Sequence, residues 1–417
     1  MLKKSSGKLM IKKIFVVMLI VFSLVITNVS DINADEGELK LYATSAVLID
    51  GSNGRVLYGK NENKVMPMAS TTKVMTLIIA LEYGNPDDVV TFSKYAASQP
   101  DVQMNAKAGE QYCLRDLLYV MMMQSYNDVA VAVAEYVADK HINGAQETDV
   151  VKERSTDESK ALIHFFAGLM NNKAKSLGCV DTYFITPNGL DDQDDEGEHS
   201  TTAYELALIC AYAVSKQDVI DICTTRQYSF SELNNKRNVS VGTTDRFLDM
   251  VSGAVGLKTG FTGKAGYCFA GAVKKDGKIL ISVVLGSGWP PNKSYKWTDT
   301  KILMNYGLND FFYRKIFIPD EEYVQIPVRD GTEEYVLTYI PYSFDMLIGE
   351  NEEVDIIYSI PEYINAPVEI NQEIGNVKIL VDDKLVKTLP IHVKETVPEK
   401  DFVWCLKYVI KIFLRYA

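Results

Sequence analysis

Apolar and polar positions follow two different periods in the first 310 residues of the chain. Two short apolar runs at 45–50 and 55–58 flank the turn-forming residues 51–54, and this arrangement predicts a β-hairpin. Helical spacing is found at 70–82, 114–123, 127–139, 158–176 and 202–215. Thr202 begins the last of these segments and Glu205 follows three residues later, which is the pattern of a capping box.

The strand pattern returns after these helices. Apolar or alternating runs occupy 255–258, 267–273 and 278–286, and the turn at 274–277 joins the last two as a hairpin. We therefore expect an α+β fold in which an antiparallel sheet is flanked by helices, over residues 38–312.

The pattern of apolar and polar residues changes after about residue 315. Short runs rich in Val, Ile and Tyr predict strands at 335–339, 354–360, 377–381 and 387–393. No set of residues suited to catalysis stands among them. We expect a small β-rich domain over 316–396, with a spacer or interaction role.

The two ends of the chain differ from the rest. Five lysines precede the apolar run 14–27, and a small residue, Ala34, follows it, so residues 1–34 predict a cleaved export signal. An uncleaved anchor is the alternative, but the run is shorter than the roughly 20 residues that span a bilayer.

The C-terminal segment 401–417 predicts an amphipathic helix. Lys407, Lys411 and Arg415 recur every fourth residue and share one helical face. We expect this helix to lie in the plane of a membrane surface, with Trp404 and Phe413 among the residues in the lipid. A helix docked on its own protein is the alternative reading.

Composition limits the possible partners. The chain of 417 residues carries a net charge of −12, and a negative surface disfavours nucleic acid as a partner. Its six cysteines include no Cys-x-x-Cys pair, so buried free thiols are expected rather than a disulfide framework or a zinc site.

Candidate chemistry begins at Ser70-Thr71-Thr72-Lys73. A serine hydroxyl is a weak nucleophile that needs a base, and Lys73 lies one helical turn away on the same face. A helix N-terminus and a second cation such as Lys258 would lower the pKa of Lys73 and so favour its neutral form. An N-cap serine beside a solvated lysine is the alternative.

Two further motifs follow in order. Ser125-Tyr126-Asn127 lies between two helical segments, where the hydroxyl could relay a proton and the Asn127 amide could hold a substrate backbone. Lys258-Thr259-Gly260 ends a strand, and its ammonium and hydroxyl groups suit a terminal carboxylate. Each motif has a structural alternative, an N-cap or a surface turn, when taken alone.

Together the three motifs resemble the penicillin-interacting serine enzymes. The chain is most similar to the low-molecular-mass D-alanyl-D-alanine carboxypeptidases, and the likeness includes Asn188-Gly189-Leu190 and Ser200-Thr201-Thr202. The resemblance implies a β-lactamase- or transpeptidase-like catalytic domain on the outer face of the cytoplasmic membrane.

The same resemblance assigns roles to residues. It implies that Ser70 is acylated, Lys73 accepts the proton, Ser125 relays it and Lys258 binds the substrate, with Thr259 beside it. It also implies stem peptides ending in D-Ala-D-Ala as substrates and β-lactams as covalent inhibitors.

Two further assignments complete the expected site. The backbone N–H groups of Ser70 and Phe261 would form the oxyanion hole, and Arg246 would help to fix the substrate carboxylate. Tyr126 and Phe261 depart from the family pattern, where a small and a polar residue are commoner. Both could narrow or dry the site.

Other functions receive less support. The four histidines stand in neither a Gly-x-Ser-x-Gly elbow nor a His-Glu-x-x-His helix, and the acidic run 191–198 has Ala203 where a calcium loop needs Glu. We therefore expect no metal and no cofactor. A β-lactamase and a non-catalytic penicillin sensor or wall-binding protein remain as alternatives, although no Glu-x-x-Leu-Asn segment stands at the spacing of a class A lactamase.

Overall fold

The computed structural model describes residues 39–144, 148–317, 324–341 and 343–415. The chain separates into two units, Met1–Lys40 and Leu41–Ala417. The predicted export signal at 1–34 lies outside the described residues and stays a prediction.

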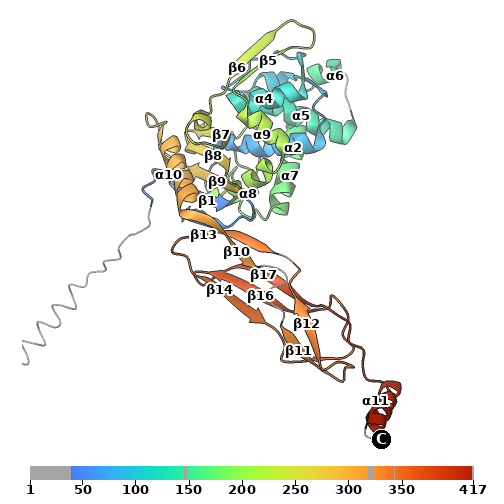
Figure 1. The fold of residues 1–417 in the computed structure, drawn as a ribbon. Helices are drawn as coiled ribbons and strands as arrows, with labels where there is room; N and C mark the ends of the chain where they lie inside the picture. Colours follow the sequence, from blue (N-terminus) through green and yellow to red (C-terminus); the bar gives the residue numbers. More distant parts are fainter. Residues whose placement is uncertain (1–38, 145–147, 318–323, 342, 416–417) are drawn as a thin grey trace, which may run out of the picture. The chain divides into compact units, whose positions relative to one another are not determined.

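Five antiparallel strands form the central sheet, in the order β2-β1-β9-β8-β7 (Figure 1). The two expected hairpins are present, because β1 pairs with β2 and β8 pairs with β9. β1 also pairs with β9, so that Ser45 stands opposite Leu285. The strands are β1 Ser45–Asp50, β2 Val56–Lys60, β7 Ala254–Thr262, β8 Gly266–Lys275 and β9 Lys278–Leu285.

Helices bury both faces of this sheet. Val47 and Ile49 of β1 belong to the same apolar cluster as the buried residues of α8, Ala203–Val214. Leu48 points to the opposite face, where Gly307 of α10, Tyr295–Asp310, lies against it. Successive side chains of a strand point to opposite faces, so the continuous apolar run in β1 reflects burial on both sides.

The remaining helices surround the motif-bearing segments. The predicted helices all form, each within four residues of its predicted ends. They are α2 Lys73–Tyr83, α3 Lys94–Ala97, α4 Leu114–Gln124, α5 Asn127–Asn143, α6 Thr148–Glu153, α7 Thr156–Ser176 and α9 Gln217–Thr224, with the short 3-10 helices η1 Ala69–Thr72 and η2 Arg246–Asp249. Two small two-stranded antiparallel sheets add β3 Val89–Thr91, β4 Gln111–Cys113, β5 Gln227–Ser231 and β6 Asn238–Gly242.

The predicted capping box at α8 forms only in part. The Thr202 hydroxyl accepts from the Glu205 N–H at 3.1 Å, as expected. The Glu205 carboxylate instead accepts from the N–H groups of Val180 and Asp181 at 2.7 and 2.9 Å. A tertiary contact has taken the side chain that the local pattern assigned to the cap, whereas Ser155 and Glu158 form a complete box at α7.

Two further sheets follow α10, and three of the four runs predicted after residue 330 fall within their strands, while the run 354–360 extends one residue past the end of its strand. β10 Phe311–Phe317 pairs with β13 Phe344–Gly349. A six-stranded sheet has the order β14-β16-β17-β12-β11-β15. Its strands are β14 Val354–Ser359, β16 Glu373–Val381, β17 Lys384–Val393, β12 Tyr335–Tyr339, β11 Gln325–Arg329 and β15 Ile364–Asn365.

The C-terminal segment forms a helix, α11 Phe402–Arg415. Our placement of Trp404 with the lipid-facing residues does not fit this helix. Trp404 is three residues before Lys407 and four before Tyr408, so it lies on the cationic side, and its ring stacks on that of Tyr408 with centroids 5.0 Å apart. The exposed apolar residues of the other side include Leu406 and Phe413.

Candidate active site

The first motif forms a tight turn at the start of α2. Ser70 lies in η1, Ala69–Thr72, and Lys73 is the first residue of α2. The Lys73 Nζ donates to the Ser70 Oγ at 2.9 Å, which is the contact that the spacing predicted. The Ser70 hydroxyl is half-buried and donates to the carbonyl of Asn188 at 3.3 Å.

Lys73 is buried among acceptors. Its Nζ also donates to Asn127 Oδ1 at 2.9 Å and to the Asn188 carbonyl at 2.6 Å. Burial lowers the pKa of Lys73 well below its ordinary value, the charge of Lys258 lowers it further, and Asp128 opposes both. The expected influence of Lys258 is present, but burial is the larger cause.

The second motif bridges two helices. Ser125 ends α4 in a left-handed conformation with φ of 68°, and Asn127 begins α5. The Asn127 side chain is buried, and its Nδ2 donates to the carbonyls of Pro100 and Asp101 at 3.1 and 3.0 Å. These amide hydrogens and Oδ1 all have protein partners, so Asn127 orients Lys73 in this structure, and its expected role toward a substrate backbone stays a prediction.

The third motif lies on β7, an edge strand of the central sheet. Lys258 is 1% exposed, and its Nζ donates to the Thr259 carbonyl at 3.0 Å. Burial lowers the pKa of Lys258 to about 8, while the nearby Asp245 carboxylate raises it. Lys258 thus carries a positive charge at neutral pH but lies close to its titration range.

Two glycines bring other segments against the nucleophile. A Cβ on Gly260 would stand 3.1 Å from the Ser70 nitrogen, and one on Gly189 would stand 2.0 Å from the Ala69 carbonyl oxygen. Gly260 therefore lets β7 approach the Ser70 turn. Gly189, with φ of 84°, does the same for residues 185–190, which we call the 185–190 loop.

Backbone strain accompanies all three motifs. Non-glycine residues with left-handed or positive φ stand at Ala69 beside Ser70, at Ser125, and at Leu257 beside Lys258, with φ of 49°, 68° and 149°. Such conformations cost on the order of 1–3 kcal/mol each and persist only where surrounding packing fixes them. Their coincidence with the motifs marks this region as the functional one.

The two remaining predicted residues lie at the edge of the region. Phe261 follows Gly260 on β7, is 44% exposed, and its ring lies 4.6 Å from that of Tyr267. Arg246 is exposed at the start of η2, directly after Asp245, whose carboxylate caps η2 by accepting from the Phe247 N–H at 2.9 Å. The structure thus gathers Ser70, Lys73 and Asn127 by direct contact, with Lys258 buried on the neighbouring strand.

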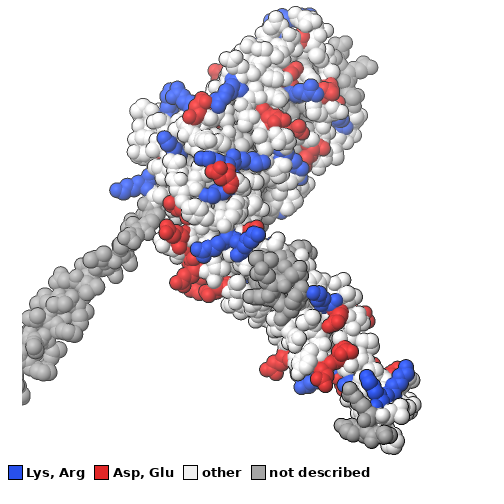
Figure 2. Space-filling model, viewed as in Figure 1, with Lys and Arg blue, Asp and Glu red and all other residues white. Residues whose placement is uncertain are grey.

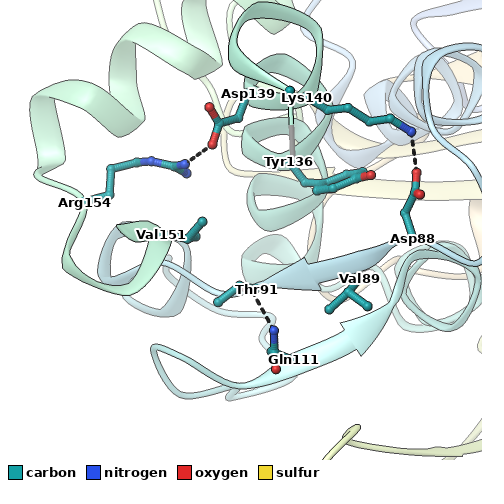
Figure 3. A pocket seen from close by; sticks show the side chains of 10 residues that line it. Asp88, Val89, Thr91, Gln111, Tyr136, Asp139, Lys140, Val151 and Arg154 are labelled. Atoms are coloured by element: carbon teal, nitrogen blue, oxygen red, sulfur yellow. Dashed lines mark hydrogen bonds and ion pairs between the residues drawn. The ribbon is translucent and has the colours of Figure 1, made fainter. Parts of the chain in front are cut away.

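Figure 3 shows a different pocket, of about 190 Å³, at the other end of α5. Its charged side chains are paired with one another: Lys140 contacts Asp88 at 2.6 Å, and Arg154 contacts Asp139. None of the three motifs contributes to its lining. It is therefore separate from the candidate active site.

The acidic run 191–198 also has protein partners. Asp191 Oδ1 accepts from the Thr262 hydroxyl at 3.0 Å, and Glu198 pairs with Lys264 at 2.7 Å. Within the described residues, no three His, Cys, Asp or Glu side chains are grouped as a metal site. The run instead ties the segment after the 185–190 loop to the end of β7.

Family models match most of the chain. The model of the D-alanyl-D-alanine carboxypeptidases, peptidase family S11, matches residues 32–147 and 163–288. The chain belongs to this family. A second model, the C-terminal domain of penicillin-binding protein 5, matches residues 311–399. The family inferred from the motifs, the fold class and the serine carboxypeptidase class are confirmed, and action on peptidoglycan places the enzyme outside the cytoplasm.

Several relatives match over nearly their whole length. The carboxypeptidase DacF of Bacillus subtilis is 28% identical over 378 residues, which cover 89% of this chain and 90% of the relative. DacC of Escherichia coli is 28% identical over 388 residues, with 87% and 86% covered. These relatives carry the same name as the matched family, D-alanyl-D-alanine carboxypeptidase.

Solved structures agree on the fold. Penicillin-binding protein 5 of Haemophilus influenzae is 24% identical with a TM-score of 0.67, covering 87% of this chain and 99% of its own. Penicillin-binding protein D2 of Listeria monocytogenes, solved with cefotaxime bound, is 29% identical with a TM-score of 0.52, covering 65% and 99%.

Sequence reasoning missed two contributors to the carboxypeptidase site. The Asn188 backbone carbonyl accepts from both Ser70 and Lys73, although Asn188 stood only among the family-like segments. His199, set aside because it fits no hydrolase motif, contacts Thr72 of the first motif. The role of a backbone carbonyl cannot be predicted from the type of its residue. The role of a single histidine cannot be predicted until the residues that it contacts are known.

Proposed function

We propose that the enzyme removes the terminal D-alanine from peptidoglycan stem peptides through an acyl-enzyme on Ser70. The observation that carries this proposal is the 2.9 Å contact between Ser70 Oγ and the buried Lys73 Nζ, at the place where the three motifs meet. Burial favours the neutral amine, which is the form that can accept a proton from the hydroxyl.

The proposed reaction has two steps. Ser70 Oγ attacks the carbonyl carbon between the two D-alanines, and its proton passes to Lys73 Nζ. The N–H groups of Ser70 and Phe261 bind the oxyanion of the tetrahedral intermediate. The C–N bond then breaks, and the leaving amine takes a proton from Lys73 by way of the Ser125 hydroxyl. Water next attacks the ester carbon and restores Ser70.

We propose that Lys258, Thr259 and Arg246 recognise the free carboxylate of the substrate. Lys258 supplies a buried positive charge, Thr259 a half-buried hydroxyl and Arg246 an exposed guanidinium on the adjacent η2. Charge-assisted hydrogen bonds to a carboxylate are stronger than those to a neutral amide. β-Lactams carry a comparable carboxylate beside a reactive amide, so the same groups would place them for covalent inhibition.

Lys258→Gln is expected to impair peptides with a free terminal carboxylate far more than the corresponding terminal amides. Removing one charge-assisted hydrogen bond costs about 1.5–3 kcal/mol, or roughly 10- to 100-fold in kcat/KM, for the acid alone. The measurement is kcat/KM for the two peptides with each enzyme. Equal losses on both would mean that Lys258 acts on the reacting centre and not on the carboxylate.

The test of the overall function is release of free D-alanine from a diacylated Lys-D-Ala-D-Ala peptide, with and without penicillin. A carboxypeptidase releases D-alanine and is inhibited by penicillin. A β-lactamase turns penicillin over rapidly, and a non-catalytic sensor binds penicillin while releasing no D-alanine.

We propose that the enzyme is held on the outer face of the cytoplasmic membrane by α11. Within the described part of the chain, no helix combines the length and apolarity needed to cross a bilayer. The apolar residues of α11 are exposed, with Phe402 at 80% and Phe413 at 76%. On the face shown in Figure 2, basic side chains gather at α11, as an in-plane helix on anionic lipid requires.

Truncation after Lys400 is expected to release soluble enzyme with unchanged activity on small peptides. This cut keeps the hydrogen bonds from Thr332 N to Pro398 O and from Lys400 N to Asp330 O, which tie the preceding segment to the β-rich part. The measurement is sedimentation with vesicles containing anionic lipid. The full-length variant with Lys407→Gln and Lys411→Gln should keep α11 but bind these vesicles less tightly. Continued sedimentation of the truncated enzyme would contradict the anchor.

A further inference from the structure

His199 lies directly behind the nucleophile turn. It is 3% exposed, and its ring is packed at 5.9 Å against that of Phe184. Its Nδ1 accepts from the backbone N–H of Ile185 at 2.9 Å and of Thr186 at 3.3 Å. Its Nε2 lies 2.8 Å from the hydroxyl of Thr72. His199 therefore joins the beginning of the 185–190 loop to the first motif.

The partners of His199 fix the direction of these hydrogen bonds. Because Nδ1 accepts from backbone N–H groups, the ring proton is on Nε2, which donates to the Thr72 hydroxyl. The Thr72 hydroxyl in turn donates to the Ala69 carbonyl at 2.8 Å. Burial lowers the pKa of His199 to about 3, so the ring is neutral and keeps this tautomer at neutral pH.

These hydrogen bonds form a hydrogen-bond chain from the 185–190 loop through His199 and Thr72 to Ala69. The chain ends at Ala69, where the site is most tightly constrained. Ala69 holds φ of 49°, its carbonyl oxygen stands 2.0 Å from where a Cβ on Gly189 would lie, and it directly precedes Ser70. The other end of the hydrogen-bond chain holds the 185–190 loop, which supplies the Asn188 carbonyl to Lys73. A shift at either end would change the distances among Ser70, Lys73 and Asn188.

We propose that His199 is a positioning residue for acyl transfer, which holds the 185–190 loop and the Ser70 turn in register through Thr72. The proposal rests on the proposed role of Ser70. His199 touches no reacting atom; it sets where Ser70 Oγ and Lys73 Nζ stand relative to each other. Its loss should therefore lower the rate of the chemical step and leave the carboxylate-binding groups unaffected.

The test compares variants that remove different hydrogen bonds of the hydrogen-bond chain. His199→Asn keeps an acceptor near Ile185 and Thr186 but loses the donor to Thr72, and Thr72→Val removes the hydroxyl at constant shape. Both should lower kcat and the rate of acylation by penicillin about 10²-fold, as expected for a displaced catalytic pair, with KM little changed. Thr72→Ser restores the hydroxyl and should recover most of the rate. The double variant should be no slower than the slower single one, because both changes break one chain.

Ser93→Ala is the matched control for stability. Ser93 is a buried hydroxyl that donates to Glu135 Oε1 at 2.9 Å and takes no part in the site. It should lower the free energy of unfolding without lowering kcat. If His199→Asn and Thr72→Val fold, lose stability and keep wild-type kcat, His199 is merely structural and the proposal fails. If Ser70→Ala remains active, the proposed function itself fails, which is a separate result.

Discussion

Ser70→Ala is expected to abolish both release of D-alanine and covalent labelling by penicillin. The Ser70 hydroxyl, which lies 2.9 Å from the buried Lys73 amine, is lost, so no acyl-enzyme can form there. Removing the nucleophile of a serine hydrolase typically lowers kcat by roughly 10⁶-fold, which makes this the largest effect expected of any single substitution here. The measurements are release of free D-alanine and mass spectrometry of the penicillin-treated protein.

The position of the adduct decides the assignment. In the wild-type enzyme the penicilloyl mass should map to the peptide that contains Ser70, and Ser93→Ala should label as the wild type does. Thermal unfolding of Ser70→Ala should match the wild type within a few degrees, because Ser70 is half-buried and its side chain makes two hydrogen bonds within the described residues. Full labelling of Ser70→Ala at another residue would overturn the role of Ser70.

The fold could be predicted from local patterns because those patterns are strong here. The hairpin turns at 51–54 and 274–277 fix which strands pair, and the helical periods around them exceed two turns. Pairing of β1 with β9 could not be read from the sequence in the same way. Ser45 and Leu285 are far apart in the chain, and the two strands are not joined by a turn.

The site could be predicted as far as its motifs reach. The Ser70 and Lys73 contact follows from helical spacing alone, because both residues stand on one turn. The contact of Lys73 with Asn127 was not predicted, since no local rule brings the starts of α2 and α5 together. The need for glycine at position 189 becomes clear only from the structure, which places it against the Ala69 carbonyl.

The prediction for Glu205 was wrong because of a tertiary contact. Its carboxylate was assigned to the helix cap from the local pattern, but it accepts from the N–H groups of Val180 and Asp181 instead. Buried polar groups are nearly always hydrogen-bonded. The partner of a buried side chain is therefore decided by which groups the tertiary packing places next to it, and not by the local sequence alone. Trp404 is a different error, of helical phase, which the sequence alone could have corrected.

Lys73 is the residue whose substitution should have the second largest effect. Lys73→Ala is expected to lower the rate of acylation by about 10²- to 10⁴-fold, because a serine hydroxyl without its base is a poor nucleophile. Lys73→Arg separates two explanations, since a guanidinium keeps the positive charge but cannot accept a proton at working pH. If Lys73→Arg acylates as fast as the wild type, charge and not basicity is the contribution of Lys73.

The pH profile tests the same role in the unmodified enzyme. Activity should rise with pH as Lys73 loses its proton, because the neutral amine is the base, and fall above about pH 8 as Lys258 loses the charge that anchors the carboxylate. Lys258 lowers the pKa of Lys73 by repulsion, so Lys258→Gln should raise it. The rising limb of kcat/KM on a peptide amide, a substrate that lacks the carboxylate, should then move to higher pH in Lys258→Gln. A rising limb that stays in place or moves to lower pH would show that another group is the base.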